Sequence, residues 1–206
     1  MRFSKQEIMF LTSISRGRVP LGVECPLPET VERERYITET IAAMKEKGII
    51  GDDHKLTKEG AIVISLWERY RNSKRHIRLN HVHAAILPEN VLITVIETED
   101  GYEVGAIRSE LFMLELAKHM EYLCLEEKAA ERGKWQDIGE EEWKAKLEEM
   151  DNGILLYEFL SGRLQSEKVY FWKDETGYLF HKTNGRIRTL SPGVMRKQIY
   201  RILKEA

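Results

Sequence analysis

The chain has little cysteine. Only two of its 206 residues are cysteines, Cys25 and Cys124, and they stand in no CxxC arrangement. The sequence leaves a disulfide between them open, but two free thiols in a reducing cytosol is the simpler interpretation.

No segment of the sequence predicts export or membrane insertion. Residues 1–7 carry charge where a signal peptide needs an apolar core. The longest apolar run, residues 61–67, is broken by Ser65 and is far too short to span a bilayer. We therefore expect a cytoplasmic protein without a membrane span.

Charge of one sign is not in excess. There are 32 Lys and Arg residues and 34 Asp and Glu residues, which gives a formal net charge of −2. This balance offers no general attraction to nucleic acid or to an anionic membrane. Hydrophobic residues make up 42% of the chain, enough to bury a core. The composition therefore predicts a globular protein.

Catalytic and metal-binding motifs are absent from the sequence. It has no GxSxG, GxGxxG or P-loop pattern. His81 and His83 lie two apart in a predicted strand, near His76, but zinc would need a third protein ligand and none lies at ligand spacing. Cys124 and His119 are five apart, which does not bring a thiol against an imidazole. We predict no enzymatic activity, no metal and no cofactor.

Two hydrophobic periods alternate along the chain and predict an α+β fold, an antiparallel sheet with helical bundles. Helical patterns occupy residues 4–15, 29–47, 57–70 and 110–123, and a final helix follows Ser191. The expected N-caps of four of these helices are Ser4, Thr57, Ser109 and Ser191. Strand patterns occupy residues 76–85, 91–96, 102–107, 154–160, 168–173, 178–181 and 186–190. We divide the chain into a helical, winged-helix-like segment 1–75, a hairpin-plus-helix unit 76–125, an acidic helical connector 126–153 and a second such unit 154–206, all within one globular domain.

The two hairpin-plus-helix units follow the same order. Asp100-Gly101-Tyr102 forms the first hairpin turn, and Thr176-Gly177-Tyr178 forms the second. Each unit has one apolar face to bury, so two units related by a pseudo-two-fold axis could cover each other. Chance similarity between two common hairpins is the alternative interpretation.

The N-terminal helices also resemble a winged-helix domain, which gives an alternative function as a transcriptional regulator with a C-terminal sensing domain. The helix over residues 29–47, however, holds five acidic and four basic residues, so it gains nothing from releasing counterions on DNA. Nucleic acid is therefore not the expected partner. Two basic clusters are predicted as solvated faces or as complements to the acidic segment: Arg69, Arg71, Lys74, Arg75 and Arg78, and Arg186, Arg188, Arg196, Lys197 and Arg201.

Three stretches resemble the EspG-type cytosolic chaperones of type VII (ESX) secretion. They are KGIIGDDHKLTKEGAIVISLWERYRNSKRHIRL, VLITVIETEDGYEVGAIRSELFMLELAKHM and VYFWKDETGYLFHKTNGRIRTLSPGVMRKQIYRIL. The resemblance lies in the order of elements and covers roughly half of the chain. That family is longer and rich in Ala, Gly and Arg, whereas this chain is rich in Lys, Glu and Ile.

The resemblance implies a pseudo-two-fold protein that holds a helical secreted protein in the cytosol and presents it to the secretion machinery. By position, partner contacts are expected at the hairpin tip, with Thr98, Glu99, Asp100 and Tyr102. A second expected surface is the acidic segment 121–151, where Trp135 and Trp143 stand among eleven acidic and five basic residues. The alternative for these two tryptophans is an internal helical bundle. Neither the identity of the partner nor the oligomeric state follows from the sequence.

Overall fold

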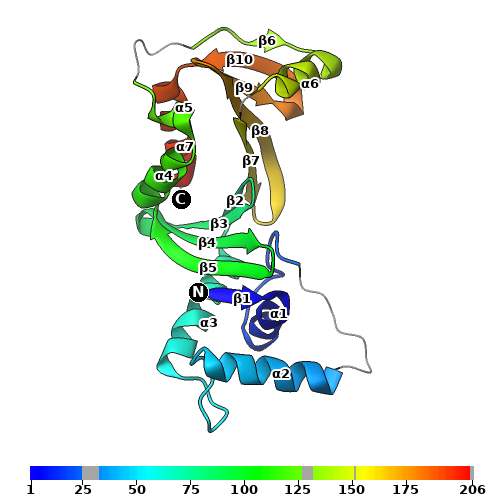
Figure 1. Ribbon diagram of the computed structural model, residues 1–206, viewed down its shortest axis with the longest axis vertical. Coiled ribbons are helices and arrows are strands. Elements are labelled where there is room, and N and C mark those ends of the chain that lie inside the picture. The colour runs from blue at the N-terminus through cyan, green and yellow to red at the C-terminus, as the bar shows by residue number, and fades with distance from the viewer. Residues whose placement is uncertain (25–32, 127–131, 151, 205–206) are drawn as a thin grey trace. The chain divides into compact units, whose positions relative to one another are not determined.

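The computed structural model describes residues 1–24, 33–126, 132–150 and 152–204, with Arg33 as backbone only, and has an α+β fold (Figure 1). The chain divides into two compact units. Unit 1 comprises Met1–Ser73, Val82–Ala85 and Ile93–Ala106. Unit 2 comprises Lys74–His81, Ile86–Leu92 and Ile107–Ala206. Each unit is described by itself.

Unit 1 contains three helices, α1 (Lys5–Ile14), α2 (Arg33–Glu46) and α3 (Lys58–Asn72). The predicted caps are confirmed. The Ser4 hydroxyl accepts from the Glu7 N–H at 3.2 Å, and the Thr57 hydroxyl accepts from the Gly60 N–H at 2.9 Å. The predicted start of the second helix, residues 29–32, lies outside the described residues.

Unit 1 contains β1 (Arg2–Ser4) and most of β3 (Val82–Leu87), β4 (Val91–Thr98) and β5 (Gly101–Arg108), in the order β1-β5-β4-β3. The remaining residues of these last three strands belong to unit 2. The sequence pattern did not predict β1, which pairs antiparallel with β5 and places Ser4 opposite Gly101. A Cβ on Gly101 would lie 2.2 Å from the Phe3 carbonyl oxygen, so only glycine lets the two backbones meet there.

Side chains of α1 and α3 contribute to the core of unit 1. Ile8 and Leu11 from α1 and Trp67 and Tyr70 from α3 are all fully buried, and the two aromatic rings of α3 stack at 5.5 Å. Arg71, predicted to lie on a solvated face, is instead 7% exposed. Its neighbour Trp67 donates from Nε1 to the Thr12 hydroxyl at 3.2 Å, so α3 is joined to α1 by polar as well as apolar contacts.

The predicted strand over residues 76–85 is wrong as a single element. It is broken at Asn80, whose φ of 51° is left-handed, into β2 (Arg75–Leu79) and β3. Asn tolerates this conformation because its short polar side chain bonds locally. His81 consequently lies in an exposed turn, whereas His83 is buried in β3. The two imidazoles do not share a strand face.

Unit 2 contains a six-stranded antiparallel arrangement in the order β2-β7-β8-β9-β10-β6. The strands other than β2 are β6 (Gln136–Asp137), β7 (Asn152–Leu160), β8 (Arg163–Lys173), β9 (Thr176–His181) and β10 (Arg186–Leu190). The helices are α4 (Ser109–Lys118), α5 (Glu121–Cys124), α6 (Glu140–Glu148) and α7 (Pro192–Lys204). Short 3₁₀ turns lie at Pro88–Asn90 and Lys182–Asn184.

Opposite faces of these strands are covered by different helices (Figure 1). On one face, buried Val169, Phe171, Phe180 and Ile187 pack against α6. On the other face, Trp172 stacks on Tyr122 of α5 with ring centroids 5.6 Å apart, and the Tyr122 hydroxyl donates to the Leu190 carbonyl at 2.6 Å. Alternation along β8 sends Phe171 and Trp172 to these two faces.

The predicted helix over residues 110–123 is two helices, because α4 ends at Lys118 and α5 begins at Glu121. Ser109, predicted as a cap, is the first residue of α4. Its buried hydroxyl bonds the carbonyls of Asn90 at 3.1 Å and Leu203 at 2.9 Å. The serine therefore holds α4 to the end of α7 rather than capping its own helix.

Candidate functional site

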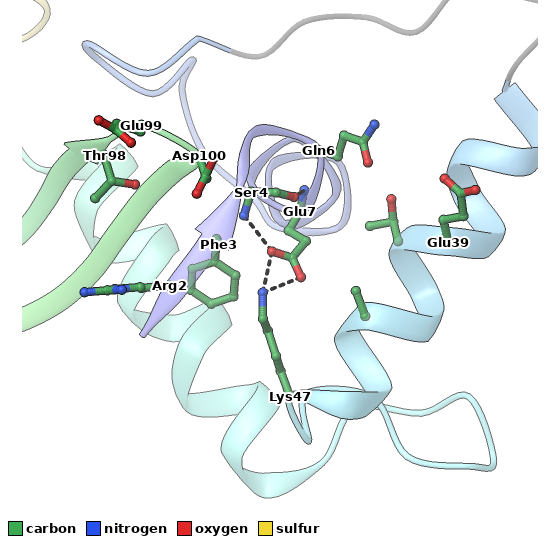
Figure 2. A pocket seen from close by; sticks show the side chains of 12 residues that line it. Arg2, Phe3, Ser4, Gln6, Glu7, Glu39, Lys47, Thr98, Glu99 and Asp100 are labelled. Atoms are coloured by element: carbon green, nitrogen blue, oxygen red, sulfur yellow. Dashed lines mark hydrogen bonds and ion pairs between the residues drawn. The ribbon is translucent and has the colours of Figure 1, made fainter.

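A pocket of about 730 Å³ opens in unit 1 where β1, α1, α2 and the β4–β5 turn meet (Figure 2). Its volume is in the range of small-ligand and side-chain sites. Side chains from all four elements line it: Arg2, Phe3, Ser4, Gln6, Glu7, Glu39, Thr40, Ala43, Lys47, Thr98, Glu99 and Asp100. The predicted hairpin tip therefore forms one wall of this pocket.

An ion pair between Glu7 and Lys47 fixes the inner wall of the pocket. Both Glu7 carboxylate oxygens lie 2.5 Å from the Lys47 Nζ, and one also accepts from the Ser4 N–H at 2.6 Å (Figure 2). The Glu7 side chain is 4% exposed and that of Lys47 is 32% exposed. The Lys47 ammonium also lies 5.3 Å from the Phe3 ring centroid. One carboxylate therefore caps α1 and ties it to the end of α2.

The rim of the pocket carries unmatched negative charge. Arg2 pairs with Glu103 at 3.3 Å, and Glu39 pairs with Arg35 at 2.7 Å. Within the described part of the chain, the exposed carboxylates of Glu99 and Asp100 form no ion pair. A cationic group is therefore the complement that this rim favours.

We expect Lys47→Met to lower the free energy of unfolding by about 2 kcal/mol, because it leaves the buried Glu7 carboxylate without its cation. The partial exposure of Lys47 keeps the loss below that of a fully buried pair. Urea unfolding measures it, and Lys55→Met, which removes an exposed lysine, is the matched control. Equal midpoints for the two variants would contradict this role for the ion pair.

Tyr102, the fourth residue predicted at the hairpin tip, is not on the pocket surface. Its side chain is 1% exposed, and its hydroxyl accepts from the Glu24 N–H at 2.9 Å. Burial raises the pKa of this phenol. Tyr102 is therefore a buried residue that supports the turn, whereas Thr98, Glu99 and Asp100 line the pocket.

The two predicted tryptophans lie in unit 2 and have different environments. Trp143 of α6 stacks on Phe180 of β9 with ring centroids 4.5 Å apart, so it packs against strands and not within the helical bundle considered as the alternative for it. Trp135 precedes β6 and is half-buried, with its ring against Arg188 and His181. Both tryptophans are partly buried, but Trp135 contacts charged and polar side chains whereas Trp143 packs against an apolar cluster.

The lining residues outside the hairpin tip were not predicted as pocket residues: Arg2, Phe3, Ser4, Gln6, Glu7, Glu39, Thr40, Ala43 and Lys47. The available signal was Ser4-Lys5-Gln6-Glu7, a capping-box pattern that anchors Glu7. Lys47 has no comparable signal, because only tertiary packing brings it to Glu7.

The predicted metal-binding and thiol residues are not brought into one cluster in the described part of the chain. No group of three or more His, Cys, Asp or Glu side chains in that part could hold a metal ion. Cys124 is a free, exposed thiol that bonds the Ala117 carbonyl at 3.0 Å, whereas Cys25 lies outside the described residues. Among the described helices, none has both the length and the apolar character needed to cross a membrane.

Comparison with known families matches residues 1–204 to the family described as "Domain of unknown function (DUF5081)". Since the match spans almost the whole chain, the chain belongs to this family. No curated protein matches the chain.

Proposed function

We propose that this member of the DUF5081 family is a non-catalytic chaperone or adaptor that holds a helical secreted protein, a substrate of type VII secretion, in the cytosol. The observation that carries the proposal is the pocket of unit 1, whose rim presents Glu99 and Asp100 to solvent without cationic partners. In this proposal a lysine or arginine of the substrate enters the pocket between the hairpin tip and α2.

The order of elements supports the likeness to EspG-type chaperones. Along the chain, β2, β3, β4 and β5 are followed by α4, and β7, β8, β9 and β10 are followed by α7. The last strand of each series also pairs with a short strand from earlier in the chain, β5 with β1 and β10 with β6. This repetition favours a duplicated, pseudo-two-fold plan over two unrelated hairpins.

The lining of the pocket supports binding rather than chemistry. Its polar groups are carboxylates, hydroxyls, an amide and two cations, and both cations are already paired. The lining has no histidine or cysteine that could serve as a base or nucleophile. Such a set can position a protonated side chain and satisfy its hydrogen bonds.

The proposal is tested by purifying the tagged chain from its native cytosol, identifying the proteins retained, and titrating the purified candidate in a calorimeter. We expect a small helical secreted protein whose affinity falls about tenfold in the Glu99→Gln, Asp100→Asn double variant, because a charged contact contributes about 1.4 kcal/mol.

The matched control is the Asp52→Asn, Glu59→Gln double variant, which removes the same charge from unit 1 outside the pocket lining. Equal losses of affinity in the two double variants would contradict the assignment of the pocket as the binding site. Recovery of DNA alone, with salt-dependent binding, would favour the winged-helix regulator instead.

A further inference from the structure

A second set of polar side chains gathers on one face of unit 2. Lys168 of β8 lies opposite His181 of β9, and His181 lies opposite Arg186 of β10. Arg188 is two residues beyond Arg186 and so points to the same face. Trp135, just before β6, covers this group. None of these residues lines the pocket of unit 1.

Arg188 is the member of this cluster whose hydrogen bonds are missing. Its Cζ atom lies 4.3 Å from the centroid of the Trp135 ring, which in turn meets His181 edge-on at 5.6 Å. The Arg188 Nε is buried without a hydrogen-bond partner, and the guanidinium forms no ion pair in the described part of the chain. Burial and the nearby charge of Arg132 lower the pKa of this arginine. A buried donor left unbonded costs free energy.

Two of the neighbouring cations, Arg186 and Lys168, already have partners. Arg186 lies 3.3 Å from the Asp137 carboxylate, and Lys168 pairs with the Glu158 carboxylate. The Arg188 guanidinium thus lies over the Trp135 ring, its Nε has no hydrogen-bond partner, and its positive charge is not paired in the described part of the chain. A planar fork in this state matches a carboxylate, which can accept two parallel hydrogen bonds.

We infer that Arg188 and Trp135 form a docking site for an aspartate or glutamate side chain of the bound protein partner. Charge complementarity selects this occupant, since Arg188 offers one unmatched cation. The inference rests on the proposed function in that the partner is a protein, and it adds that the partner presents an acidic side chain to unit 2.

The test uses a short fluorescein-labelled peptide with regularly spaced glutamates and a matched peptide with glutamine at those positions. Fluorescence anisotropy should show binding of the glutamate peptide to the full chain and at least tenfold weaker binding to Arg188→Ala. Arg188→Lys keeps the charge without the fork and should weaken binding severalfold. Trp135→Phe keeps an aromatic face and should weaken it less than Trp135→Ala.

Lys197→Ala, which removes an exposed lysine from α7, is the control and should bind like the unaltered chain. Three outcomes overturn the inference: equal binding of the glutamine peptide, no loss in Arg188→Ala, or no binding of the glutamate peptide up to about 1 mM. Tighter binding of a single-stranded oligonucleotide that depends on Arg188 would assign the site to phosphates and overturn it as well.

The peptide probe needs no native partner, so the two proposals fail separately. If no secreted helical protein is recovered from the cytosol but the glutamate peptide binds through Arg188, the chaperone proposal fails and the carboxylate site remains. If a secreted substrate binds through Glu99 and Asp100 while the peptide does not distinguish Arg188→Ala, only the carboxylate site fails.

Discussion

Arg71→Ala is expected to lower the free energy of unfolding by about 3 kcal/mol, the largest effect of any substitution considered for unit 1. The buried guanidinium donates to the carbonyls of Arg18 at 2.6 Å, Thr12 at 2.9 Å, Gly17 at 3.0 Å and Ser15 at 3.1 Å, and to the Ser15 hydroxyl at 2.7 Å. Truncation leaves these acceptors without a donor and opens a gap beside α3. The segment after α1, residues 15–18, should become less ordered, because three of these carbonyls belong to it.

Urea denaturation followed by circular dichroism measures this loss. Arg71→Lys should be intermediate, because an ammonium can reach only some of these carbonyls. Arg69→Ala, which removes an exposed arginine from the same helix, should change stability by no more than about 0.5 kcal/mol. If the Arg71→Ala and Arg69→Ala proteins unfold at the same urea concentration, the buried network is not a major source of stability.

Gly60→Ala is expected to destabilise the protein by about 2 kcal/mol, although a glycine-to-alanine change inside a helix ordinarily stabilises by up to about 1 kcal/mol. A Cβ on Gly60 would lie 2.1 Å from the Ile49 carbonyl oxygen and 2.9 Å from its carbonyl carbon. These are backbone atoms, and the same carbonyl accepts from the Thr57 N–H at 3.0 Å. The first turn of α3 cannot move away without breaking that bond.

Gly105→Ala is the matched control, because a Cβ on this strand glycine would meet only the Thr94 hydroxyl oxygen, at 3.8 Å. It should leave the urea midpoint unchanged or raise it slightly. A Gly60→Ala protein as stable as the Gly105→Ala protein would contradict the close approach of α3 to Ile49.

Local chemistry made several elements predictable. Ser4 and Thr57 begin α1 and α3 as expected, because their hydroxyls bond backbone N–H groups only three residues away. The sequence also predicted the turn at Asp100-Gly101. Three of the four residues expected at its tip, Thr98, Glu99 and Asp100, line the pocket. Where the prediction failed, at Asn80, a left-handed residue turned one expected strand into two.

Charge patterns were a poor guide to the positions of individual arginines. Arg71 stood in a cluster predicted to be solvated, yet it is buried among carbonyls far away in sequence. Arg188 stood in a similar cluster, yet it lies under Trp135 with a buried, unbonded donor. The spacing of basic residues says which side of an element they share, but not which neighbours the tertiary fold places against them.

The sequence by itself determined the mixture of helices and antiparallel strands, the capped helix starts and the hairpin tip, since each depends on contacts within a few residues. Only the tertiary structure decided three other relations. Glu7 and Lys47 line a pocket beside that tip, the Trp143 ring stacks on Phe180, and the Trp135 ring lies over the Arg188 guanidinium. These relations depend on packing between residues that lie 37 to 53 positions apart in the sequence. No local propensity encodes such pairings, because the free energy that selects them comes from burying whole faces together.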